Sequence, residues 1–187
     1  MTNTFGQRPS RRRFLHAAAA MPLACLLPNH AAADACAAPL TVKQVLRMSP
    51  CELDQLFAGG ALCEQPVGPW HGKIILRVDK RHPYRTARVQ GLVWKGKEFY
   101  PDGAFTNRWL GFRRPSSSHV HVGPSWFDGQ PCLILDYPSG TPVFGNARDE
   151  LRLIAQPAMI LGRFYERPVR VRNTQGYFVL QPKCGGC

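Results

Sequence analysis

Three charged residues lie on strand faces that are otherwise apolar. In residues 132–137, side chains of even number share one face of an extended strand, so Asp136 lies beside Ile134. In residues 149–154, Asp149 shares the odd face with Leu151. Arg108 likewise falls on the apolar face of residues 107–112. An unpaired buried charge costs several kcal/mol, so we expect these three groups to pair or to face a polar cavity.

We predict that Arg108 bridges Asp136 and Asp149 inside the protein, with Tyr137 or Asn107 at the margin. Such a polar cluster would bind the polar end of a ligand. Two structural interpretations stay open at this stage: one or more of these faces contacts solvent, or the ion pairs only fix the register of the strands.

Aromatic residues extend the candidate ligand site. Trp94 and Trp109, if they face the interior, supply flat contact surface for an apolar ligand. An enzyme is the alternative, with Asp136 or Asp149 as general acid or base and Tyr137 assisting. No serine lies in a Gly-x-Ser-x-Gly elbow, so a hydrolase triad has no support and no catalytic residue is assigned.

Two histidines are the remaining candidates for metal chemistry. His119 and His121 share one strand face, but no third ligand follows from the sequence. We therefore expect no metal ion and no cofactor.

These residues need a framework of short strands. Ser49, Pro50 and Glu52 form a strong helix start with a capping box, and residues 41–48 suggest a short helix before it. Beyond residue 70 the pattern changes to strands separated by turns, with Asp128-Gly129 as a hairpin signal and no helix among them. The expected strands are 72–78, 88–99, 105–113, 119–123, 132–137, 150–154, 159–165, 169–172 and 177–180. Nine strands joined mostly by hairpins must form a sandwich or a barrel.

Several motifs in residues 66–181 resemble a known family. They are Trp94-Lys-Gly-Lys-Glu-Phe99 with Gly91 before it, Gly68-Pro-Trp-His-Gly72, Asn107-Arg108, Asp128-Gly129, Leu135-Asp-Tyr137, Arg148-Asp-Glu-Leu-Arg152 and Leu161-Gly162. Together they resemble the bacterial GXWXG-type domains of unknown function, which are similar to lipocalin-like (calycin) barrels. The resemblance implies an antiparallel up-and-down β-barrel with an interior cavity and small apolar ligands. It implies no established reaction.

The N-terminal segment resembles an export signal. Ser10-Arg-Arg-x-Phe14-Leu15 follows the twin-arginine pattern, and a short apolar run precedes small-residue cleavage sites at Ala33 and Ala35. Acylation at Cys25 is the rival processing route. The expected organisation is therefore a signal peptide at 1–35, a helical segment at 36–65, a barrel at 66–183 and a Cys-Gly-Gly-Cys tail at 184–187. This places the protein in the periplasm or outside the cell, after contact with the twin-arginine translocase.

Charge and cysteines constrain the partners. The chain has 24 basic and 12 acidic residues, and its basic surface suits an anionic envelope surface. No nucleic-acid-binding signature accompanies the charge. Six cysteines follow the signal, Cys36, Cys51, Cys63, Cys132, Cys184 and Cys187, and they allow up to three disulfides.

The sequence thus predicts an all-β protein, an antiparallel lipocalin-like barrel preceded by two short helices. The favoured function is binding or carrying a small apolar or lipid-like molecule in the cell envelope. The two alternatives are an enzyme acting on a lipid-like or cyclic substrate, and an envelope structural or interaction protein.

Overall fold

The computed structural model describes residues 39–78, 80–137, 147–156, 158–166 and 175–183. The expected signal peptide at 1–35, the strand at 169–172 and the tail at 184–187 lie outside these residues, as does Cys25. No helix in the described part of the chain is long and apolar enough to span a bilayer.

Two short helices precede the first strand, as predicted. They are α1 (Val42–Val45) and α2 (Pro50–Ala58). Ser49 caps α2 by accepting from the Glu52 amide, and the Glu52 carboxylate accepts from the Ser49 amide in return. This reciprocal pair satisfies two backbone donors that the first turn of a helix leaves unbonded, so the start of α2 is encoded locally.

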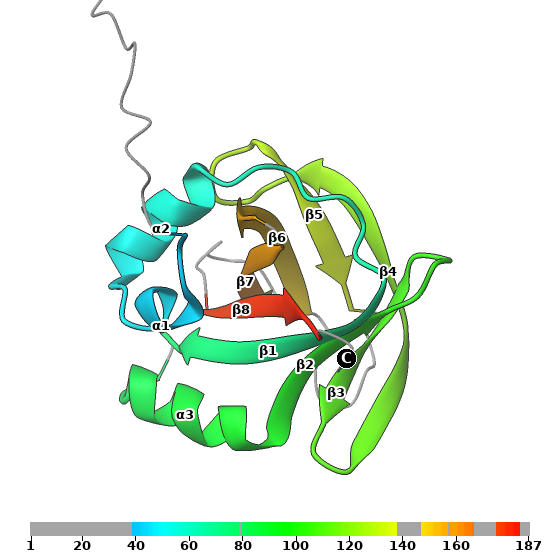
Figure 1. Cartoon of the computed structure of the whole chain (residues 1–187), viewed down its shortest axis with the longest axis horizontal. Helices are drawn as coiled ribbons and strands as arrows, with labels where there is room; N and C mark the ends of the chain where they lie inside the picture. Colours follow the sequence, from blue (N-terminus) through cyan, green and yellow to red (C-terminus); the bar gives the residue numbers. More distant parts are fainter. Residues whose placement is uncertain (1–38, 79, 138–146, 157, 167–174, 184–187) are drawn as a thin grey trace, which may run out of the picture. The chain divides into compact units, whose positions relative to one another are not determined.

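Beyond these helices, the described residues contain a closed barrel of eight antiparallel strands, which confirms the predicted fold class (Figure 1). Each strand pairs with the next along the chain, and β8 pairs with β1 to close the sheet. The strands are β1 (Gly68–Leu76), β2 (Trp94–Phe99), β3 (Ala104–Trp109), β4 (Phe112–Pro124), β5 (Pro131–Asp136), β6 (Ala147–Ala155), β7 (Met159–Glu166) and β8 (Gly176–Pro182). Closure leaves none of these eight strands with an unpaired edge.

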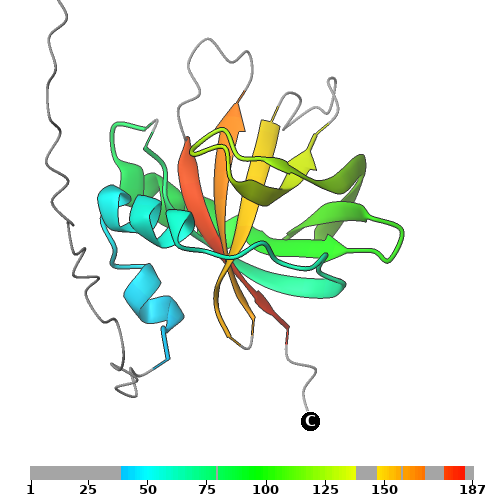
Figure 2. The same ribbon diagram turned by 90° about the horizontal axis from the view of Figure 1, so that it is seen from above.

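Two expectations about the elements were wrong. A helix, α3 (Pro83–Val93), occupies part of the segment expected to be a strand from residue 88. Pro83 stands in its first turn, where a missing amide costs nothing. Figure 1 shows α3 on the outside of the barrel, and Figure 2 gives the same structure from above, with α3 largely behind α1 and α2. The expected strand 105–113 is two strands, β3 and β4, joined through Gly111, whose φ of 83° suits a tight turn.

Alternation along the strands divides the core into an inner and an outer part. The inner cluster, called the inner apolar cluster below, lies inside the barrel and includes Trp70, Trp94, Phe99, Phe105, Leu133, Leu135, Tyr137, Leu151, Ile160, Phe178 and Leu180. The outer cluster packs α1 and α2 against β1, β7 and β8, with Val45, Leu53, Phe57, Ile75, Leu161 and Val179 among its members. Even-numbered residues of β8 belong to the inner cluster and odd-numbered residues to the outer one.

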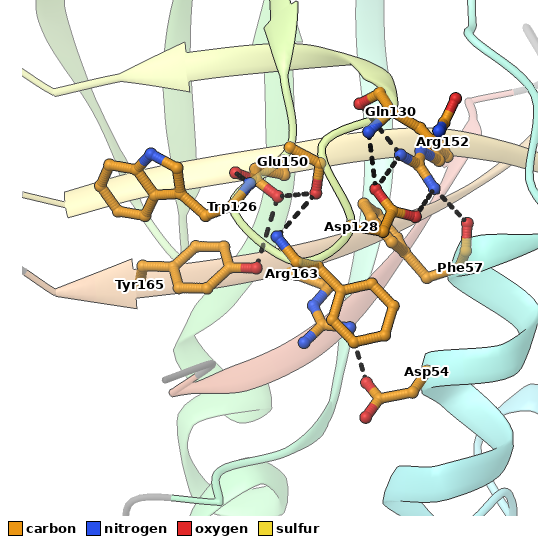
Figure 3. Close-up of polar contacts among 11 residues, drawn as sticks. Asp54, Phe57, Trp126, Asp128, Gln130, Glu150, Arg152, Arg163 and Tyr165 are labelled. Carbon is orange, nitrogen blue, oxygen red and sulfur yellow. Dashed lines mark hydrogen bonds and ion pairs between the residues drawn. The ribbon is translucent and has the colours of Figure 1, made fainter. Parts of the chain in front are cut away.

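A buried carboxylate, Glu150, organises the outer face of β6 (Figure 3). It accepts from the Ser125 hydroxyl at 2.6 Å and from the Trp126 amide at 2.7 Å. Arg148 forms an ion pair with it at 2.9 Å and also donates to the Pro124 carbonyl. These bonds attach the β4–β5 loop to the barrel wall.

Two arginines continue this outer network towards α2 (Figure 3). Arg152 donates one hydrogen bond to each carboxylate oxygen of Asp128, both at 2.7 Å, and another to the Phe57 carbonyl at 3.0 Å. Arg163 forms an ion pair with Asp54 of α2 at 2.6 Å. Arg152 therefore joins both the β4–β5 loop and α2 to β6, and Arg163 joins α2 to β7.

The described cysteines are free thiols. Cys51 is exposed, and Cys63 and Cys132 are buried. None of these three thiols is part of a disulfide, so the allowed maximum of three disulfides is not reached. Cys36, Cys184 and Cys187 lie outside the described residues.

Glu150→Ala should destabilise the fold by about 3–5 kcal/mol, because it leaves Arg148 as a buried charge without its counter-ion. Urea denaturation followed by circular dichroism measures this loss. The exposed Glu64→Ala serves as control and should change the free energy of unfolding by less than about 0.5 kcal/mol. A loss no larger in Glu150→Ala than in the control would contradict the buried network.

The two buried thiols should make the fold sensitive to alkali. Burial raises the pKa of Cys63 to about 11, and burial followed by the charge of Glu150 raises the pKa of Cys132 to about 12. A thiol with a raised pKa stabilises the fold below the pKa of the unfolded chain, 9.0, and that contribution is lost as the pH rises towards 11.

Between pH 9 and 11, each such thiol lowers the free energy of unfolding by up to about 1.4 kcal/mol per pH unit. Wild type should therefore lose stability more steeply than Cys63→Ala/Cys132→Ala when both are unfolded in urea with reductant present. Parallel pH dependences in the two proteins would show that these thiols ionise as they do in water.

Candidate functional site

The candidate site begins with an irregularity in β2. The register between β2 and β3 shifts between Trp94 and Gly96, and Gly96 has a φ of 122°. A Cβ at residue 96 would lie 2.1 Å from the Trp70 carbonyl oxygen, so only glycine allows β1 and β2 to approach this closely. Because the shift reverses the alternation, Trp94 and Lys97 both reach the inner cluster although they are three residues apart.

Lys97 is the centre of a polar cluster inside the barrel. Its ammonium group forms an ion pair with Asp149 at 2.8 Å. It also donates to the Tyr137 hydroxyl at 2.6 Å and to Asn107 Oδ1 at 3.1 Å. All three hydrogens of the ammonium group therefore have acceptors, which a cation with 1% exposure requires.

The partners of Lys97 also bond to one another. The Tyr137 hydroxyl donates to Asp149 Oδ2 at 3.0 Å and accepts from Asn107 Nδ2 at 3.0 Å. Asn107 Oδ1 accepts a further bond from Trp94 Nε1 at 3.1 Å. We call these five residues, Trp94, Lys97, Asn107, Tyr137 and Asp149, the inner polar cluster. They come from β2, β3 and β6 and from the residue that directly follows β5.

Aromatic rings surround the Lys97 ammonium group. Its nitrogen lies 5.2 Å from the ring centroids of Phe105 and Tyr137, 5.4 Å from Phe178 and 5.9 Å from Trp94. The negative faces of these rings attract the cation and partly replace its lost hydration.

Burial shifts the pKa values of Lys97 and Tyr137, which are hydrogen-bonded to each other. Burial lowers the pKa of Lys97, and the charge of Asp149 opposes this shift. Burial, followed by the charge of Asp149, raises the pKa of Tyr137 well above its ordinary value. The phenol therefore stays protonated and acts as a donor to the carboxylate.

Most of the residues predicted for the site reach the interior. Asn107, Tyr137, Asp149 and Trp94 belong to the inner polar cluster, and Trp109 packs against the inner apolar cluster. The cation was predicted wrongly: Lys97, not Arg108, bonds to Asp149. Alternation counted through β2 without its bulge places Lys97 on the face opposite Trp94, and Gly96 within a strand was the signal that a bulge was present.

Arg108 and Asp136 do not join the cluster. Arg108 follows Asn107 on β3 and so lies on the opposite, outer face, where its charge lowers the pKa of His71 after the larger effect of burial. Asp136 lies 3.7 Å from His121, with its side chain 36% exposed. The predicted bridge between the two aspartates is therefore wrong. Asp149 pairs with Leu135 and Asp136 pairs with Arg148, so the two aspartate side chains lie on opposite faces of the sheet.

A separate cleft of about 430 Å³ opens between residues 62–65 and strands β4 and β5. Leu62, Cys63, Val120, Val122 and Leu133 give it an apolar lining. Leu133 also belongs to the inner apolar cluster, so the cleft contacts that cluster. It lies four residues before Tyr137 along an extended segment, which separates the cleft from the inner polar cluster.

In the described residues, no group of three or more His, Cys, Asp or Glu side chains is arranged to hold a metal ion. No protein-family model, curated protein or solved structure matches this chain. The side-chain geometry is therefore the basis for the proposal below.

Single replacements at the ion pair should destabilise the fold far more than the double replacement. Lys97→Met leaves Asp149 buried without a counter-ion, and Asp149→Leu leaves Lys97 in the same state, so each should cost about 3–5 kcal/mol. Lys97→Met/Asp149→Leu removes both charges, so its free energy of unfolding should differ from that of wild type by less than about 1.5 kcal/mol. Additive losses in urea denaturation would contradict direct pairing of the two charges.

Proposed function

We propose that this protein binds a small, partly apolar molecule inside the barrel and holds the molecule's polar end at the inner polar cluster. The observation that carries the proposal is the Lys97–Asp149 ion pair, which is enclosed among aromatic and aliphatic side chains. The same barrel interior supplies the apolar contact surface and the polar groups that orient a ligand.

A purely structural role explains this cluster less well. A buried ion pair contributes little more stability than apolar side chains of similar volume, and it often contributes less. Pairing of all eight strands, with β8 closing onto β1, already fixes the register. A charged group inside an otherwise apolar barrel therefore supports a binding role.

The hydrogen-bonding capacity that remains in the inner polar cluster suggests the chemistry of the ligand. Both side-chain bonds to Asp149 end on Oδ2, so Oδ1 remains for a ligand that donates a hydrogen bond. Asn107, Tyr137 and Asp149 keep 5–7% exposure while Lys97 lies beneath them at 1%. We infer a ligand with a hydroxyl or amine group at one end and an apolar body.

The enzyme alternative has weaker support from this geometry. Asp136 lies outside the cluster, and Asp149 is held by both Lys97 and Tyr137, so proton transfer through it would require breaking an ion pair. Tyr137, with its raised pKa, is a poor general base.

Export is part of the same proposal. The twin-arginine pattern at Ser10–Leu15 directs folded proteins across a membrane, and a closed barrel hides its strand edges before transport. The proposed place of action is therefore the periplasm or the cell exterior. The resemblance to lipocalin-like and GXWXG-type barrels supports a small apolar ligand.

Native mass spectrometry of the protein purified from its own cells tests the proposal. Wild type should carry an added mass that disappears under denaturing conditions and identifies the ligand. Lys97→Met/Asp149→Leu should lose that mass while its circular dichroism stays that of a folded barrel.

Asp54→Leu/Arg163→Met is the matched control, because it removes an ion pair from the outer face of the same barrel. It should keep the ligand. An empty wild-type protein, or equal ligand occupancy in Lys97→Met/Asp149→Leu, would contradict binding at the inner polar cluster. Retained ligand in that variant would assign binding to the separate cleft instead.

A further inference from the structure

We propose that the outer surface of α3, together with Leu110, docks on an anionic phospholipid bilayer. This surface consists of Tyr84, Arg85, Arg88, Val89, Leu92, Val93 and Leu110, and we call it the α3 surface. The inference does not depend on a ligand inside the barrel.

Large apolar side chains gather on this surface. Val89 and Leu92 are each 65% exposed, and Val93 is 45% exposed. Leu110, at 64% exposure, lies next to Val93 because its amide donates to the Val93 carbonyl at 2.7 Å. A contiguous group of exposed aliphatic residues is typical of an interaction site, whereas scattered ones are ordinary.

The helix is attached to the barrel through its other face. Ala87 is the one residue of α3 that is buried, and Gln90 accepts from Arg77 of the chain after β1 at 3.0 Å. Figure 1 shows α3 lying outside the barrel beside β1. The apolar residues of the α3 surface are therefore not needed to hold the helix in place.

Basic and apolar residues share the exposed face of α3. Arg85, Arg88, Val89 and Leu92 are spaced by three, one and three residues, which places them on one side of an α-helix. All four are exposed. Arginine stems can lie along an apolar surface while their guanidinium groups reach phosphates, so this side suits the boundary between headgroups and acyl chains.

The charged residues of α3 and of the segments next to it in the sequence are all basic between Lys80 and Lys97. Residues 80–97 contain no aspartate or glutamate. Lys80, Arg81, Arg85 and Arg88 are all exposed, and Lys95 is partly exposed. This surface is therefore electrostatically complementary to anionic lipid, and aliphatic side chains among the cations favour a bilayer over a purely acidic polymer.

Vesicle sedimentation of the wild-type protein tests the proposal. The probes are vesicles of phosphatidylglycerol with phosphatidylethanolamine, compared with vesicles of phosphatidylcholine alone. Wild type should bind the anionic vesicles, and binding should weaken as salt rises from 0.1 to 0.5 M, because shorter screening lengths reduce the attraction. Failure to bind the anionic vesicles, or equal binding to phosphatidylcholine, would overturn the proposal.

Two variants separate the charged and apolar contributions. Arg85→Gln/Arg88→Gln should weaken binding roughly 30-fold, because each basic residue near an anionic surface contributes roughly 5-fold to the affinity and the two factors multiply. Val89→Ser/Leu92→Ser should weaken binding at both salt concentrations, because its lost contacts are apolar. Wild-type affinity in either variant would overturn the proposal.

The matched control neutralises the same number of charges elsewhere. Lys43 and Arg47 are exposed residues near α1, and Lys43→Gln/Arg47→Gln should change vesicle affinity by less than about 3-fold. A loss as large as that of Arg85→Gln/Arg88→Gln would show that net charge alone causes binding and would overturn docking through α3. Lys97→Met/Asp149→Leu should bind vesicles like wild type, which separates this test from the test of the ligand site.

Discussion

Pairing of β8 with β1 is the constraint on which the rest of the structure depends. Once the sheet is closed, every second side chain of each strand points into one enclosed interior, and the others point outward. A charged residue on an inward position then has no route to bulk water and must find its partner across the barrel. Lys97 of β2 and Asp149 of β6 meet this requirement, although 52 positions separate them in the sequence.

Strand β6 shows how one segment meets this requirement on both of its faces. Asp149 and Leu151 face the barrel interior, whereas Glu150 and Arg152 face outward and are nevertheless buried. The β4–β5 loop and α2 cover the outer face, and their backbone groups and carboxylates satisfy its charges. The outer network thereby fixes the covering elements, while the inner polar cluster lies where a bound molecule would be oriented.

The two proposed activities use different parts of the fold and different physical effects. Binding inside the barrel relies on a few directed hydrogen bonds in a region of low dielectric, where each is strong and each unpaired group is costly. Docking through α3 relies on an exposed, salt-sensitive surface whose members need no exact geometry. A carrier of a lipid-like molecule would benefit from both.

The sequence by itself determined the two capped helices, the positions of β5 to β8, an all-β fold of either sandwich or barrel type and the inward face of Asp149. These features follow from local rules: a capping box, alternation over an uninterrupted strand, and turn residues between apolar runs. The tertiary structure alone decided that Lys97 and not Arg108 meets Asp149, because a bulge at Gly96 reverses the alternation in β2. It also decided that the outward face of β6 is buried, since which loop or helix covers a strand depends on contacts between residues far apart in the chain.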